Sequence, residues 1–144
     1  MRCPNPSTGG FSLIELVIVL GVFGIIMGFG IPAFHHYLLS QALRGTSENL
    51  VQTLNLQRAR AMAIGQNVIL NFNTGAPNGW TVLAEGRSNH NNLPNGVTYA
   101  SVNPGTLTLT RAGRVNTSGM VVFQNQAGAT DTVSIQVSGL ALIR

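Results

Sequence analysis

Apolar residues are distributed in two contrasting patterns along this chain. Residues 11–34 form a near-continuous apolar run, whereas from about residue 66 onward apolar and polar positions alternate in short stretches. Folded as a helix, residues 11–34 would extend roughly 36 Å at about 1.5 Å per residue, which is enough to cross the hydrocarbon core of a bilayer with some tilt. The first pattern therefore predicts a transmembrane helix, and the second predicts a separate domain.

The helical pattern continues beyond the apolar run as an amphipathic stripe over residues 35–65. Apolar side chains recur there at intervals of three, four and seven residues: Leu39, Leu43, Leu50, Leu54, Ala61 and Met62. Arg44 and Glu48 lie off this stripe at the i,i+4 spacing of a helical ion pair. Gly65 is a typical helix terminator, so we expect one helix over residues 11–64.

Residues 66–144 change to the period of two that is typical of β-strands. We expect strands, separated by clusters of Gly, Pro, Asn and Ser, at residues 67–72, 80–85, 97–102, 106–111, 120–124, 132–137 and 140–143. The polar stretch 87–96 is predicted to be the longest loop, either a solvated connection or a recognition loop. The predicted fold is α+β, with a long N-terminal helix packed on a small antiparallel β-sheet or two-sheet domain.

Composition and charge exclude several classes of function. Charged residues make up 8% of the chain, every basic residue is Arg, and the net charge of +4 is low for a dedicated duplex-DNA binder. No sequence motif of a hydrolase, a zinc enzyme or a nucleotide-binding loop occurs. His35 and His36 are adjacent, so on a helix they point about 100° apart and do not form a metal site. We therefore expect no enzyme, no cofactor and no metal.

A single carboxylate, Glu15, interrupts the start of the apolar run. A charge at the centre of a transmembrane helix costs about 2.5–3.5 kcal/mol, and less near an end, where Glu15 lies. Such a residue is functional by default, and the alternative is a carboxylate that only reaches the lipid headgroups. Gly24 and Gly28 form a G-x-x-x-G pair, which either allows close helix packing or reflects the general glycine content of membrane helices. Pro32 removes a helical hydrogen bond, so we expect a kink around residues 28–32.

The segment Gly10-Phe11-Ser12-Leu13-Ile14-Glu15 resembles the type IV pilin and pseudopilin superfamily. The resemblance implies that residues 1–10 are a leader, that a prepilin peptidase cuts between Gly10 and Phe11, and that the new N-terminus of Phe11 is methylated. It also implies that Glu15 pairs with the ammonium group of a neighbouring subunit during filament assembly, in which Gly24, Gly28 and Pro32 take part. The pairing agrees with the high cost of an unpaired charge in an apolar setting.

The second half of the chain is similar to H-type minor pseudopilins of type II secretion and to T- and U-type minor pilins. Their Gly-Arg endings have counterparts in the segments 110–115 and 137–144. DNA-binding T-type minor pilins end in Gly-Arg-x-Arg, whereas this chain has Gly139-Leu140-Ala141-Leu142, which argues against DNA binding through that motif. The remaining candidates for DNA contact are Arg87, Arg111, Arg114 and Arg144.

The sequence therefore predicts a minor pilin or pseudopilin subunit of a type IV pilus or type II secretion filament. We expect a single-pass protein of the bacterial inner membrane, with its C-terminal domain in the periplasm and with other pilin subunits as partners. The alternative is a DNA-binding minor pilin of natural transformation. Two further alternatives are an anchored β domain that does not polymerise and a secreted protein cleaved after Ala42.

Overall fold

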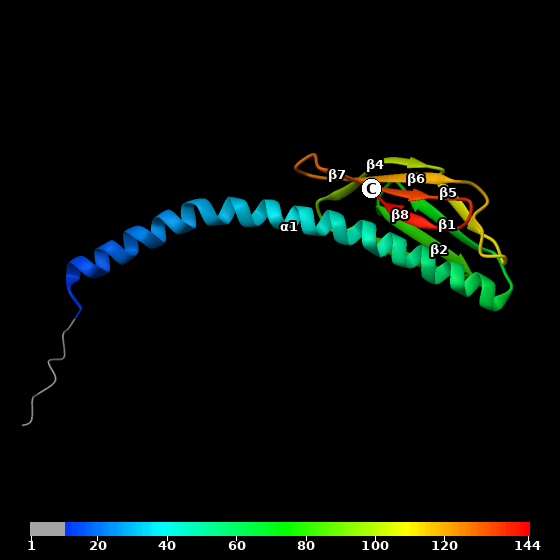
Figure 1. The fold of residues 1–144 in the computed structure, drawn as a ribbon, viewed down its shortest axis with the longest axis horizontal. Coiled ribbons are helices and arrows are strands. Elements are labelled where there is room, and N and C mark those ends of the chain that lie inside the picture. Colours follow the sequence, from blue (N-terminus) through cyan, green and yellow to red (C-terminus); the bar gives the residue numbers. More distant parts are fainter. Residues whose placement is uncertain (1–10) are drawn as a thin grey trace, which may run out of the picture. The chain divides into compact units, whose positions relative to one another are not determined.

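The structure is a computed structural model in which residues 11–144 are described, apart from the side chains of residues 29–33. Contacts divide it into two compact units, with the boundary between His36 and Tyr37 inside a long helix (Figure 1). The predicted cleavage residue Gly10 and the side chain of Pro32 lie outside the described residues. In the described part of the chain, no helix has the length and apolarity of a membrane span.

The helix α1, Leu13–Ile64, confirms the helix predicted over residues 11–64. At its start, the backbone N–H groups of Glu15 and Leu16 both donate to the carbonyl of Ser12. At its end, Gly65 has a φ of +67°, a left-handed conformation that glycine adopts without the steric penalty of a side chain. The helix therefore ends where the sequence indicated and begins at Leu13, slightly after the predicted start at residue 11.

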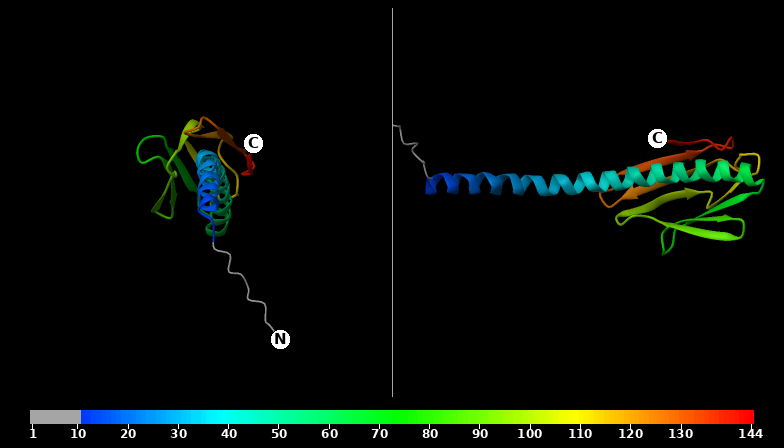
Figure 2. Two further views of the ribbon diagram at one scale, coloured as in Figure 1. Left: turned by 90° about the vertical axis from the view of Figure 1, so that its left-hand side faces the viewer. Right: turned by 90° about the horizontal axis from the view of Figure 1, so that it is seen from below.

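The chain after the helix forms two four-stranded antiparallel sheets (Figures 1 and 2). Sheet A has the order β3-β2-β1-β5, with β1 at Val68–Asn73, β2 at Gly79–Ala84, β3 at Arg87–Asn92 and β5 at Thr106–Leu109. Sheet B has the order β4-β6-β7-β8, with β4 at Val97–Asn103, β6 at Gly119–Asn125, β7 at Thr130–Ile135 and β8 at Ala141–Ile143. This confirms the α+β class with a two-sheet domain.

Both sheets share one core with the second half of α1. Leu50 and Leu54 of the helix are almost completely buried, as are Leu70 of sheet A and Phe123 of sheet B. Figure 2 shows the strands of both sheets running alongside this half of the helix. Since a fully buried large apolar side chain contributes about 1.5–3 kcal/mol, this core stabilises residues 37–144 as one unit.

Aromatic rings connect the two sheets. Phe123 lies 5.3 Å from Tyr99, which also belongs to sheet B, and 6.5 Å from Trp80 of sheet A, measured between ring centroids. The Tyr99 hydroxyl donates to the carbonyl of Gly79 at 2.7 Å. Burial raises the pKa of the Tyr99 phenol above its ordinary value, because the phenolate would lose hydration. The neutral Tyr99 hydroxyl therefore holds sheet B against sheet A.

One predicted loop is wrong over most of its length. Residues 87–92 of the stretch 87–96 form the edge strand β3, which pairs with β2 in the register Ala84↔Arg87. The two residues between the strands, Glu85 and Gly86, have φ values of 53° and 72°, as a two-residue hairpin turn requires. The strand was missed because its side chains are all polar and show no alternation.

Candidate assembly segment and arginine surfaces

The first part of α1 exposes apolar side chains on every face. All described side chains of residues 11–28 are exposed, and the large apolar ones are 43–84% accessible. A helix that is apolar all round is normally buried in a protein core or a membrane. This segment, here called the assembly segment (residues 11–28), therefore requires a partner or lipid to cover it.

Glu15 is the single charged residue of the assembly segment and lies in the first turn of α1. Its carboxylate makes no hydrogen bond or ion pair with any residue that the structure describes. Its position near the positive end of the helix dipole is favourable for a carboxylate. Phe11, four residues earlier, is 84% exposed, so the start of the described chain is open to a partner.

The glycines of the assembly segment leave open space on its surface. A Cβ atom added to Gly21, Gly24 or Gly28 would have nothing within 4 Å besides the helix itself. The predicted G-x-x-x-G pair therefore has no partner within the described chain, and a second helix could approach its backbone closely at this point. The role of Pro32 and the kink expected around residues 28–32 stay predictions.

Three of the four candidate DNA-contacting arginines lie at the end of the domain where α1 terminates. Arg111 and Arg114 belong to the tight turn after β5, and the backbone N–H of Arg111 donates to the Asn67 side chain at 3.2 Å, just beyond the helix. Arg87 begins β3 at the same end of sheet A, because β1 starts and β2 ends there. All three side chains are exposed.

Arg144 lies toward the other end of the domain. Its backbone N–H donates to the carbonyl of Thr132 at 2.8 Å, and the neighbouring Ile143 lines a groove together with Leu43 of α1. Leu43 lies about 28 Å along the helix from Met62, which contacts the turn after β5. The fold thus brings Arg87, Arg111 and Arg114 to one end and separates Arg144 from them.

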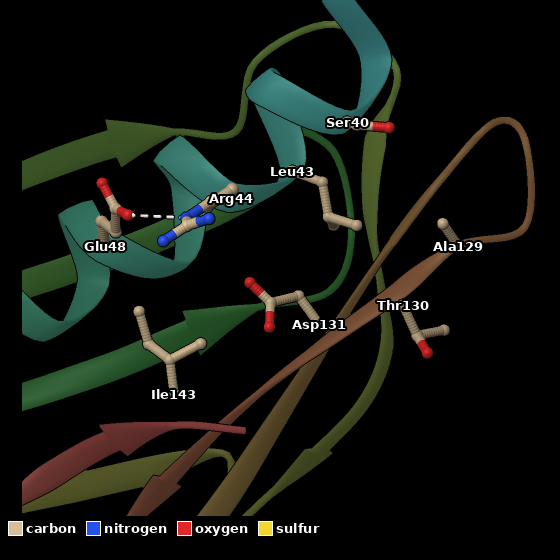
Figure 3. Close-up of a pocket in the computed structure, with 8 residues that line it drawn as sticks. All are labelled: Ser40, Leu43, Arg44, Glu48, Ala129, Thr130, Asp131 and Ile143. Atoms are coloured by element: carbon tan, nitrogen blue, oxygen red, sulfur yellow. Dashed lines mark hydrogen bonds and ion pairs between the residues drawn. The ribbon is translucent and has the colours of Figure 1, made fainter. Parts of the chain in front are cut away.

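The groove beside Arg144 has a volume of about 480 Å³ and lies between α1 and the β7–β8 edge of sheet B. Figure 3 shows Arg44 paired with Glu48 on the helix, with Asp131 and Ile143 facing them from the strands. The Arg44–Glu48 distance of 3.0 Å confirms the predicted i,i+4 pair. Within the described residues, no three His, Cys, Asp or Glu side chains are grouped to hold a metal.

The groove was not predicted, because it unites residues from opposite ends of the domain sequence. The sequence offers one indication of this site, since Asp131 is one of just four acidic residues in the chain. The Asp131 carboxylate accepts the N–H of Thr132 at 3.0 Å. Since the groove is shallow, mixed in polarity and already supplied with an internal ion pair, its residues do not form a recognisable catalytic arrangement.

Comparison with known proteins gives a specific match at the N-terminus. Residues 6–31 match the prokaryotic N-terminal methylation motif. The chain is 43% identical over 42 residues to prepilin peptidase-dependent protein D of Escherichia coli, and 51% identical over 39 residues to the type IV major fimbrial protein FimA of Dichelobacter nodosus. These matches cover 29% and 26% of this chain, and only 29% and 24% of the two relatives.

The chain is also similar to solved structures in its fold. The minor pseudopilin EpsH from the type 2 secretion system of Vibrio cholerae matches with a TM-score of 0.58 and 15% identity, over 71% of this chain and 95% of that one. The type IV minor pilin FimU of Pseudomonas aeruginosa matches with a TM-score of 0.58 and 16% identity, over 73% and 90%. At such identities the likeness concerns the fold alone.

Motif and fold together define the class of this protein. The chain is a type IV pilin/pseudopilin-like protein with a minor-pseudopilin-like fold. The superfamily that the sequence resembled is thereby confirmed.

Proposed function

We propose that this chain is a minor subunit of a type IV pilus or type II secretion filament and that it assembles through the assembly segment. Before assembly, residues 11–34 anchor it in the bacterial inner membrane, and residues 37–144 lie in the periplasm. The observation that supports this proposal is the continuous exposure of apolar side chains over residues 11–28. An exposed apolar surface of this extent is a site of interaction with lipid or protein.

Cleavage supplies the second half of the proposed contact. A cut between Gly10 and Phe11 creates an ammonium group at Phe11, four residues from the Glu15 carboxylate. Both charges are costly among apolar side chains unless they are paired. We infer that Glu15 of one subunit receives the methylated ammonium group of a neighbouring subunit, while Gly24 and Gly28 let the helices approach closely.

Mass spectrometry of membrane fractions tests the processing step. The expected mature chain begins at N-methylated Phe11, and Gly10→Leu should leave the precursor uncut. Gly21→Leu is the matched control, because Gly21 lies in the helix with open space around it and should be processed normally. An uncut wild-type chain, or a chain cut after Ala42, would contradict the proposal.

DNA capture is a second candidate, supported by the grouping of Arg87, Arg111 and Arg114 at one end of the domain. If all three contacted phosphates, each contact would add about 0.9 to the slope of log Kd against log salt concentration. Binding would then be roughly 40-fold weaker at 200 mM salt than at 50 mM. An anisotropy titration of the full chain in detergent with duplex DNA measures this slope. Tight binding that Arg111→Ala/Arg114→Ala abolishes would place DNA capture first.

A further inference from the structure

We propose that Met62, Arg111, Arg114, Val137 and Leu140 form a docking surface for another protein, here called the terminal-turn patch. The partner we infer is a protein different from this chain, with a face that carries carboxylates beside apolar side chains. The inference concerns only residues 37–144 and holds whether or not the assembly segment polymerises.

The two turns of the patch touch each other through glycines. A Cβ atom on Gly139 would lie 2.5 Å from the carbonyl oxygen of Gly113, and the two residues have φ values of +81° and +72°. Both glycines also lie against Arg58 of α1, with Cβ-to-Nε separations of 3.1 and 3.3 Å. Segments separated by more than 20 residues in sequence are therefore held together on the helix.

Hydrogen bonds make the first turn rigid and tie it to the second. The N–H and the hydroxyl of Thr110 both donate to the Arg114 carbonyl, at 2.8 and 2.9 Å, and the Arg114 N–H donates to the Thr110 hydroxyl at 3.2 Å. The Val115 N–H then donates to the Val137 carbonyl at 3.0 Å. A surface ordered in this way loses little conformational entropy on binding.

The side chains on these turns combine cationic and apolar character. Met62, Val137 and Leu140 are 47%, 48% and 44% exposed. The guanidinium groups of Arg111 and Arg114 are exposed and have no hydrogen bond or ion pair within the described residues. Arginine and methionine are enriched at protein–protein interfaces, and arginines among apolar neighbours often contribute most of the binding energy.

A second copy of this domain offers no Asp or Glu side chain without a partner of its own. Of its carboxylates, Glu48 pairs with Arg44, Glu85 pairs with Arg60, and Asp131 accepts a backbone N–H of its own chain. A planar guanidinium group pairs best with a carboxylate or a phosphate. Since these carboxylates already have partners within their own chain, we infer that the anionic group comes from a different molecule.

The apolar members of the patch favour a protein over a nucleic acid. Duplex DNA would meet two guanidinium groups with its phosphates, but it would leave Met62, Val137 and Leu140 without apolar contacts. A protein face with carboxylates next to apolar side chains would match both kinds of group at once. DNA is therefore an outcome that the experiment must detect, and not the partner we infer.

Site-specific photo-cross-linking in intact cells tests the proposal with the full chain. A photoreactive amino acid replaces Leu140 in the patch or, as a control, the exposed Asn89 on β3. We expect an adduct with a protein other than this chain from position 140 and not from position 89. The cross-linked segment of the partner should contain Asp or Glu next to apolar residues.

A synthetic peptide copying that cross-linked segment then measures binding to the full chain in detergent. We expect Arg111→Glu/Arg114→Glu and Leu140→Ser each to weaken binding by about tenfold or more, while Arg87→Glu leaves it unchanged. Unaltered thermal unfolding shows that the variants fold. In the cross-linking experiment, the proposal is overturned by an adduct with DNA or with a second copy, by equal adducts at both positions, or by no adduct. In the binding experiment, it is overturned if either variant binds the peptide as tightly as the wild type does.

Discussion

The two halves of this molecule use apolar residues in opposite ways. In residues 37–144, side chains such as Leu50, Leu107 and Phe123 are completely buried in a core made by α1 and two sheets. In residues 11–28, side chains of the same kinds are exposed on every face of the helix. The apolar side chains of the first region are covered by the chain itself, whereas those of the second must be covered by lipid or by another protein.

This contrast separates folding from assembly. A substitution in the core of residues 37–144 should change the free energy of unfolding of that domain. A substitution in residues 11–28 should leave that quantity unchanged and act on insertion or filament assembly. Matched pairs of the same residue type, one in each region, therefore test the division directly.

The largest expected effect comes from a pair of phenylalanines. Phe123→Ala should lower the free energy of unfolding by about 3–5 kcal/mol, because Phe123 is fully buried between Tyr99 and Trp80. Phe23→Ala should have no effect, since Phe23 is 54% exposed. Denaturant unfolding of the full chain in detergent, followed by Trp80 fluorescence, measures both. Equal losses in the two variants would refute the division.

A pair of glycines should give a smaller difference. Gly139→Ala should destabilise the domain by about 1–3 kcal/mol, because its new Cβ would meet the Gly113 carbonyl and its φ is positive. Gly24→Ala meets nothing and should leave unfolding unchanged. The same fluorescence experiment applies, and a neutral Gly139→Ala would show that the two turns are not in contact.

Tyr99 should show the smallest effect and a dependence on pH. Tyr99→Phe removes the hydrogen bond to Gly79 and should cost about 0.5–1.5 kcal/mol at pH 7. Because burial raises the pKa of Tyr99 in the folded state, the wild-type domain should lose stability as the pH rises above about 10, the ordinary pKa of tyrosine. Unfolding measured from pH 8 to 11 should show this loss in the wild type and less of it in Tyr99→Phe.

The sequence was informative where the chemistry of single segments decided the structure. The helix and most of the strands followed from periodicity, and Gly65 marked the end of α1. The strand β3 was missed because its pairing comes from the turn at Glu85 and Gly86, and its own side chains carry no apolar signal.

The candidate sites divide in the same way. Glu15 stood out in sequence because a lone carboxylate in an apolar run is unusual. The separation of Arg144 from Arg111, and the contact between the turns at Gly113 and Gly139, depend on strand order and packing. Neither property is visible in the local sequence, so only the fold could place these surfaces.

The most direct test of the central claim is to measure how much of this subunit is present in purified filaments. Wild-type chain should co-purify with the filament and begin at methylated Phe11. Glu15→Val should be processed and held in the membrane with its domain folded, but be depleted from filaments by about tenfold or more, because the ammonium of the neighbouring subunit loses its partner.

Glu48→Val is the control for this measurement, because Glu48 is an exposed carboxylate of residues 37–144 whose ion pair with Arg44 lies at the surface and contributes little stability. It should enter filaments as the wild type does. Normal incorporation of Glu15→Val, or absence of the wild-type chain from filaments, would contradict the claim that neighbouring subunits cover residues 11–28 and pair with Glu15.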